Sequence, residues 1–300
     1  MMWVAWAFLS AFLLGCYDVS KKMAVSRNAV IPVLFLNTMI SSLLFLPFVL
    51  LSYRSDMLDG TMFYVPRVSW QTHGLVFLKS VIVLTSWMAG YFSVKHLPLT
   101  ITGPVKATQP VLTLLGALII FSERLNLYQW IGVLLAVLSF YMLSSSGRKE
   151  GIRFTHNKWI LYAVLSVVAG SMSGLYDKYL MRSLDVMTVQ VWFNMYQFAL
   201  MTPILLFLWY PHRKRTTPFE WRWGILLISV FLAIADWIYF YALSFPDSMI
   251  SIVSMIRRSS VLVTFAAGAL LLHEKNLRSK AVDLRSEEHT SELQSRSAIS

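Results

Sequence analysis

Charge is scarce in this chain. Lysine, arginine, aspartate and glutamate make up 14% of its 300 residues, whereas a soluble domain has roughly a quarter of its residues charged. Hydrophobic residues account for 57% of the chain, and the mean hydropathy is +0.60. Because so few polar groups cannot cover a water-exposed surface, the composition excludes a soluble globular protein and predicts a chain solvated by lipid.

Cysteine and the common catalytic motifs are also lacking. The single cysteine, Cys16, excludes an intrachain disulfide and a cysteine metal cluster. The sequence contains no metal-binding histidine spacing, no His-Glu-x-x-His motif, no glycine-rich phosphate loop and no serine elbow. We therefore predict no catalytic residue, no metal and no cofactor. The net charge of +11 would suit nucleic acid in a soluble protein, but basic loops explain it in a membrane protein, so no nucleic-acid partner is predicted.

Long apolar runs dominate instead. The chain enters apolar sequence without a basic stretch before it, which predicts a retained first helix and not a signal peptide. Runs such as 111–121 are apolar without a break, whereas the strands of a membrane barrel alternate apolar and polar residues. The sequence predicts an all-α polytopic membrane helix bundle, with spans near 3–19, 29–52, 72–94, 98–121, 126–145, 158–180, 186–210, 222–243 and 247–272.

An internal repeat divides the chain. Residues 15–18 read Gly-Cys-Tyr-Asp, residues 174–177 read Gly-Leu-Tyr-Asp, and each stretch ends an apolar run. Later, Lys106 stands seventeen residues before Glu123, and Arg257 stands seventeen residues before the glutamate at 274. Landmarks that recur in the same order predict a transporter built from two related halves. An odd number of helices per half reverses the second half in the membrane, so we predict a ten-helix inverted repeat of five plus five.

The repeat sets the expected domains. Residues 1–145 form the first five-helix repeat, 146–157 a polar linker, and 158–284 the second repeat. A tenth helix is expected to begin near Asn276, but residues 285–295 match the translation of a common sequencing-library adapter. We therefore predict that 285–300 are an artefactual tail and that the tenth helix is cut short.

Basic residues predict the orientation in the membrane. Most loop lysines and arginines follow the odd-numbered spans, among them Lys21, Lys22, Arg148, Arg153, Arg213, Lys214 and Arg215. Since basic loops stay in the cytoplasm, we expect these connections there and the N-terminus outside. The expected location is the plasma or inner membrane.

Several stretches resemble a known family. The chain is similar to the drug/metabolite transporter superfamily in its EamA-type branch, through residues 109–111, 121–125, 129–132, 268–270 and 273–275. The resemblance covers essentially all of 1–284 and implies a ten-helix carrier that moves small metabolites by alternating access, commonly exporting amino acids or related solutes. Two departures stand out: the second-half equivalent of Pro110 is Val261, and the tenth helix is missing.

Charged residues inside the spans are candidates for substrate binding, because each costs a few kcal/mol in the membrane and needs a partner or a function. The repeat makes Lys106 and Arg257 equivalent, which predicts an anion pocket near the midplane. Arg258 follows about 100° around the helix, and Lys79 either lines the cavity or reaches the interface. The Arg257-Arg258 pair resembles the phosphate-binding pair of organelle sugar-phosphate carriers.

Acidic residues supply the alternative, which is internal neutralisation of these cations by Asp236, Asp18 or Asp177. Asp236 is the candidate for proton coupling, unless an ion pair with Arg257 removes that property. The Tyr-Asp steps Tyr17-Asp18 and Tyr176-Asp177 are either interfacial anchors or gates that pair with bases. Weaker repeat matches add four candidate substrate contacts, which could equally be packing residues: Asn37, Asn194, Trp87 and Trp237.

These observations predict a secondary active transporter that exports an anionic or zwitterionic solute, such as an amino acid or an organic or phosphorylated acid. Its expected partners are that solute, the bilayer and a coupling proton or ion, and it is expected to be a monomer or homodimer. A receptor or scaffold and, further from the evidence, a membrane enzyme are the alternatives. The sequence leaves the substrate and the coupling ion open.

Overall fold

The computed structural model describes residues 2–25, 28–96, 105–106, 108–128, 158–214 and 217–260, with 130–131, 133–135, 138 and 263. All regular elements in these residues are helical, which confirms the all-α prediction for them. The long helices are α1 (Met2–Val25), α2 (Val30–Arg54), α3 (Trp70–His96), α5 (Gln109–Ile120), α7 (Lys158–Met181), α8 (Val186–Ile204), α9 (Gly224–Ser244) and α10 (Ile250–Arg258). Short helical turns cover Asp56–Leu58, Leu205–Trp209 and Tyr210–His212.

Six of the helical segments are long and apolar enough to cross a membrane: Met2–Lys21, Val30–Arg54, Trp70–Gly90, Lys158–Met181, Val186–His212 and Gly224–Ser244. They coincide with six of the predicted spans, so the prediction of a multi-pass bundle holds for these segments. The predicted spans 98–121 and 247–272 are described only in part, as α5 and α10. Most of 126–145, and the stub of the tenth helix, lie outside the described residues.

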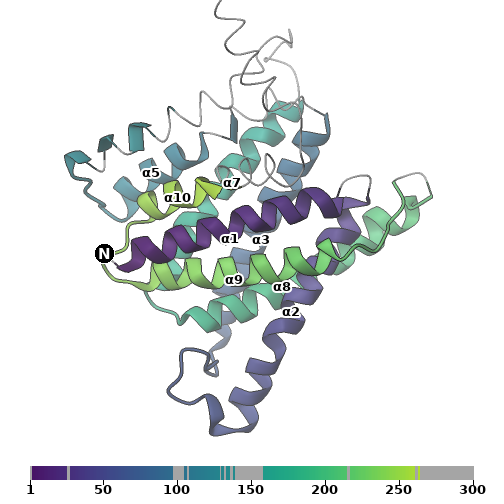
Figure 1. Ribbon diagram of the computed structural model, residues 1–300, viewed down its shortest axis with the longest axis horizontal. Helices are drawn as coiled ribbons and strands as arrows, with labels where there is room; N and C mark the ends of the chain where they lie inside the picture. The colour runs from purple at the N-terminus through teal and green to yellow at the C-terminus, as the bar shows by residue number, and fades with distance from the viewer. Residues whose placement is uncertain are drawn as a thin grey trace, which may run out of the picture.

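Six of the eight long helices in the described residues pack in two groups of three. Helix α1 packs against α9 and α10, and α7 packs against α3 and α5. Figure 1 shows α1 and α9 side by side along the molecule. The groups meet where α10 contacts α5 and where α9 contacts α7, while α2 and α8 pack against each other. The two groups correspond to each other. The contact of α1 with α9 matches that of α7 with α3, and the contact of α1 with α10 matches that of α7 with α5.

Small residues allow this close packing. Ser86 on α3 and Ser166 on α7 each donate a hydroxyl hydrogen bond to the other's carbonyl, at 2.8 and 2.9 Å. Gly15 on α1 faces Ser260 and Val263, so closely that a side chain there would collide with both. Small residues at helix contacts are typical of membrane bundles, where lipid gives no hydrophobic drive for helices to associate. Large apolar side chains such as Phe8, Phe12 and Leu161 remain exposed, where lipid would cover them.

The bundle has two distinct ends. At one end, the start of α1 meets the turn between α9 and α10, because the Trp3 indole donates to the Asp247 carboxylate at 3.1 Å. We call this the N-terminal end. At the opposite end, the connection between α1 and α2 meets the connection before α9: the Asn28 amide donates to the Glu220 carbonyl at 2.7 Å, and Arg222 donates to the Met23 carbonyl at 3.1 Å.

Gly15→Val tests whether the α1–α10 contact needs glycine. An added Cβ would lie 2.5 Å from Val263 Cβ and 3.0 Å from the Ser260 carbonyl oxygen. We expect a loss of about 1–3 kcal/mol in unfolding free energy, since a well-packed contact cannot absorb the extra volume. Gly74→Val on α3 is the matched control, because nothing lies within 4 Å of its added Cβ. Equal shifts in the thermal unfolding of the two detergent-solubilised variants would contradict the expectation.

Candidate functional site

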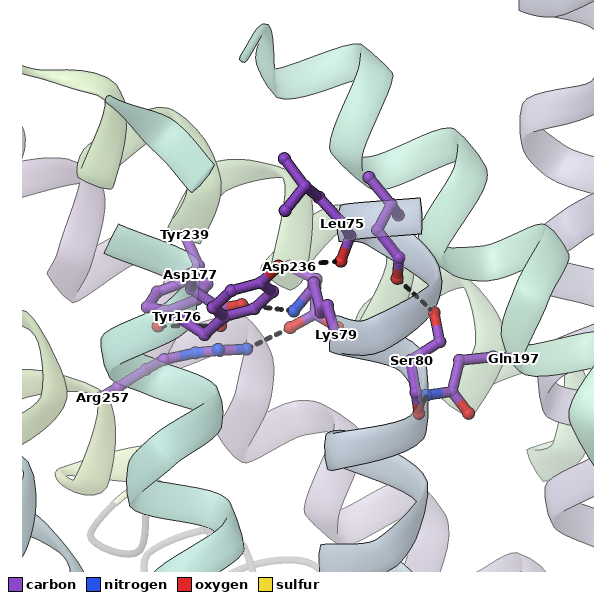
Figure 2. A network of polar contacts seen from close by, with 10 residues as sticks. Leu75, Lys79, Ser80, Tyr176, Asp177, Gln197, Asp236, Tyr239 and Arg257 are labelled. Atoms are coloured by element: carbon purple, nitrogen blue, oxygen red, sulfur yellow. Dashed lines mark hydrogen bonds and ion pairs between the residues drawn. The ribbon is translucent and has the colours of Figure 1, made fainter. Parts of the chain in front are cut away.

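Charged and polar side chains from four helices converge inside the bundle. Figure 2 shows the group that we call the charged network, which joins the two helix groups: Lys79, Asp177, Tyr239, Arg257 and Asp236. Lys79 comes from α3, Asp177 from α7, Tyr239 and Asp236 from α9, and Arg257 from α10. The network unites four of the residues that the sequence singled out with a tyrosine that it did not.

The most deeply buried part of the network is an ion pair between α3 and α7. The Lys79 ammonium lies 2.5 Å from the Asp177 carboxylate, and the two side chains are only 2% and 7% exposed. The ammonium also faces the rings of Phe193 and Phe240, at 4.3 and 4.7 Å from their centroids. Two aromatic faces and a carboxylate together replace the water that the ammonium loses on burial.

Tyr239 connects this pair to the second ion pair. Its hydroxyl donates to the other carboxylate oxygen of Asp177 at 3.3 Å, and its ring faces the Arg257 guanidinium at 4.1 Å. Arg257 in turn pairs with Asp236, which precedes Tyr239 by about one turn on the same face of α9. These side chains are 19% and 17% exposed, so the second pair is more accessible than the first. The Arg257 Nε has no hydrogen-bond partner among the described residues.

The remaining predicted cations lie beside the network. Arg258 donates to the amide oxygen of Gln109 on α5 and has no carboxylate partner within the described part of the chain. Lys106 is exposed. Asp18 on α1 is half-buried and lies close enough to interact electrostatically with Arg258 and Lys106. The predicted cations therefore lie near carboxylates: Asp177 pairs with Lys79, Asp236 pairs with Arg257, and Asp18 is close to Arg258 and Lys106.

The two Tyr-Asp steps differ in their surroundings. Asp177 is inside the bundle, with 5% of its surface exposed, so the interfacial-anchor interpretation does not describe its position. Tyr176 donates its hydroxyl to the Leu75 carbonyl at 3.2 Å, as Figure 2 also shows. Tyr17 is buried, and Lys21 lies over its ring at 5.3 Å.

The four weaker candidates have other contacts. Asn37 and Asn194 are buried on α2 and α8; Asn194 donates to the Gln190 carbonyl at 2.7 Å, and the Asn37 side-chain oxygen has no partner among the described residues. Trp237 stacks between Phe63 and Tyr241, with ring centroids 5.6 and 5.5 Å away. Its indole donates to a methionine sulfur, and Trp87 packs against the main apolar core. The contacts of Asn194, Trp237 and Trp87 are therefore those of packing residues in this structure.

Comparison with known proteins identifies the family. The sequence model of the EamA-like transporter family matches residues 1–145 and 157–282, which is nearly the whole chain. The chain belongs to the EamA-like transporter family. A solved structure titled "Crystal structure of protein" has the same fold, with a TM-score of 0.60 and 17% identity, over 88% of this chain and 89% of its own. No curated protein matches the sequence.

Family membership makes this EamA-like chain a multi-pass membrane protein of a transporter family, as its apolar helices also indicate. Sequence reasoning missed Tyr239, although its spacing of three from Asp236 on one helix would have placed both on one face. The sequence marked Glu123 as a landmark of the repeat but did not predict the contacts of Glu123 or Lys178, whose partners lie far away in sequence. Within the described residues there is no cluster of metal-ligating side chains.

The Lys79–Asp177 pair of the EamA-like protein can be tested by charge removal. Lys79→Met or Asp177→Asn leaves a buried charge without its partner, so we expect each to lower the unfolding free energy by about 3–5 kcal/mol. The double variant should lose much less, because no charge is stranded. Thermal unfolding of purified protein measures this.

The matched control is the pair between Arg222 and Glu220, whose side chains are 33% and 60% exposed. Removing either member should cost about 1 kcal/mol or less. Additive losses in the Lys79→Met, Asp177→Asn double variant would show that the buried pair is not coupled.

Proposed function

We propose that this protein is a secondary active transporter that exports a small anionic or zwitterionic metabolite by alternating access. The observation that carries the proposal is the junction of the two helix groups. There a buried charged network ends in a partly accessible ion pair, beside an arginine that has no carboxylate partner among the described residues. Membership in a transporter family supports the general activity. Export is proposed because the resemblance implies it.

The arrangement of helices supports a carrier of five plus five helices in inverted halves. The main packing pairs of one helix group correspond to those of the other under a single exchange of helices. Transporters built from inverted repeats bind their solute near the midplane, where the repeats meet. In this chain that meeting place is the contact of α10 with α5, where Arg258 meets Gln109.

Charge favours an anion at this place. Among the described residues, five positive charges lie around this place, from Lys79, Arg257, Arg258, Lys106 and Lys21, against three carboxylates from Asp177, Asp236 and Asp18. Positive charge is in excess, so a solute carboxylate or phosphate would be attracted to the site. Within the described part of the chain, the guanidinium of Arg258 bonds a neutral amide and no carboxylate, so we propose that it makes the first contact with the solute.

The observed ion pair with Arg257 is the arrangement expected to remove proton coupling from Asp236 in this state. We therefore propose Asp236 as the proton-coupling group only for the state in which a solute anion has displaced it from Arg257. While ionised, it holds Arg257 in an ion pair. Protonation removes its charge and frees the guanidinium for the solute anion, so binding of solute and proton favour each other. This predicts that proton and solute move in the same direction, so net export requires an outward proton gradient or an outward solute gradient.

The basic loops support an orientation with the N-terminal end outside. Lys21, Arg213, Lys214 and Arg222 lie in or beside the connections at the opposite end. The positive-inside rule would keep that end in the cytoplasm. We accordingly propose the plasma or inner membrane as the location.

Transport by the full chain in reconstituted vesicles tests the function. Acidic and zwitterionic solutes, including amino acids and phosphorylated acids, would be screened for uptake and efflux. For a solute that is moved, Arg258→Ala, Arg257→Ala and Lys106→Ala should each lower transport about tenfold or more, because each removes a charge-assisted contact. The exposed Arg222→Ala is the matched control and should transport normally. Unchanged transport in all three variants would refute the anion site.

Proton coupling has its own test. In Asp236→Asn, which cannot release or take up a proton, solute movement should no longer accelerate when a pH gradient is imposed in the solute's direction. Exchange of labelled for unlabelled solute at equal pH should persist, because it needs no net proton movement. Glu220→Gln, at the surface, should keep the full response to pH. A pH-driven acceleration that survives in Asp236→Asn would assign coupling elsewhere.

A further inference from the structure

The turn between α9 and α10, residues 245–249, is held by side chains from the other helix group. Glu123 follows α5, and Lys178 lies in the last turn of α7. Lys178 bonds the turn itself and Glu123 bonds the start of α10 that follows it, at the N-terminal end of the bundle where Trp3 also bonds Asp247. The turn is therefore fastened to the group formed by α3, α5 and α7, although it belongs to the group formed by α1, α9 and α10.

Glu123 caps the start of α10. Its carboxylate accepts hydrogen bonds from the backbone N–H groups of Ile250 and Ser251, at 2.7 and 3.3 Å, and from the Ser251 hydroxyl. The first N–H groups of a helix lack partners within it and carry partial positive charge, so a carboxylate suits them. A helix is normally capped by the side chain of its own N-cap residue. In α10 that residue is Met249, whose side chain makes no capping bond.

Lys178 binds carbonyl groups at the end of α9. Its ammonium is buried and donates to the carbonyls of Leu243 and Phe245, at 3.1 and 3.2 Å, and to the Ser248 hydroxyl. All three ammonium hydrogens thus have acceptors. A cation at the last carbonyls of a helix is stabilised by the helix dipole.

We propose that Glu123 and Lys178 are gate residues, which hold the N-terminal end closed and set the position of the arginines on α10. A cap from a neighbouring residue stabilises a helix in any conformation, whereas a cap from another helix group exists only while the groups touch. Helix α10 has nine residues, with Ile250 at the capped end and Arg257 and Arg258 at the other, about 10 Å along the axis. Release of the cap would move both arginines, so opening the gate alters the anion site. This inference rests on the proposed alternating-access transport.

Cysteine labelling tests the gate without knowledge of the solute. In a Cys16→Ser background, Ala117→Cys places a reporter on α5, in the core that contains Val253 of α10. Thr61→Cys, in the exposed α2–α3 connection at the same end, is the reporter control. A membrane-impermeant maleimide is added to the side that carries Thr61. We expect Glu123→Gln and Lys178→Met each to raise the labelling rate at position 117 about tenfold, and to leave position 61 unchanged.

Glu220→Gln is the matched carboxylate control, because it removes a charge at the opposite end. Unchanged labelling at position 117 in both gate variants would overturn the proposal. So would an equal increase from both sides of the membrane, which indicates general unfolding. If one of the two gate variants does not fold, the labelling rate of the other tests the proposal, because Glu123 and Lys178 act on different helix ends.

Transport measurements separate the two hypotheses. Faster labelling in the gate variants, with no solute transported by the unaltered chain, would leave the gate intact and refute the proposed function. Unchanged labelling in both variants, with solute transport and its dependence on Arg258 preserved, would refute the gate and leave the proposed function standing.

Discussion

The rest of this structure depends on one constraint: charged side chains buried inside the bundle must be paired. A membrane bundle has lipid outside and no bulk water between its helices, so an ionised side chain inside it requires an opposite charge or other polar partners. Lys79 and Asp177 meet this requirement across α3 and α7. Sliding either helix by one turn would strand both charges, so the pair sets how these helices align. Through Tyr239, the same pair also determines where Arg257 can lie.

The same constraint shapes the proposed anion site. A fully balanced network would reject a charged solute, and an unbalanced one would be too costly to fold. This chain has both features: the inner pair is buried, the outer pair is partly accessible, and Arg258 bonds an amide and no carboxylate among the described residues. The buried pair therefore joins α3 to α7, while the more accessible charged groups lie on α9 and α10. Binding and gating are both proposed for the same pair of helices.

Hydropathy predicted the six described spans because a membrane helix needs only an unbroken apolar run of sufficient length. Their charge and their position inside the spans also made Lys79, Arg257 and Asp236 candidates for substrate binding or for pairing with one another. The partners were harder to predict, since Lys79 and Asp177 are 98 residues apart and meet only because α3 packs on α7. The sequence therefore allowed Asp177 to be an interfacial anchor, whereas the structure places it inside the bundle. The inverted repeat of five plus five helices, and the tail after residue 284, stay predictions.

The role of Glu123 depends on contact between the two helix groups, which its sequence context does not reveal. In sequence it closes an apolar run, as a helix-terminating glutamate at the membrane surface would. In the structure its carboxylate serves a different helix, whose own N-cap residue supplies no capping bond. A terminus that lacks a local cap is stable only while the opposite group is in contact with it. The free energy of that contact therefore favours the conformation in which the two helix groups touch, as the proposed alternating-access transport requires.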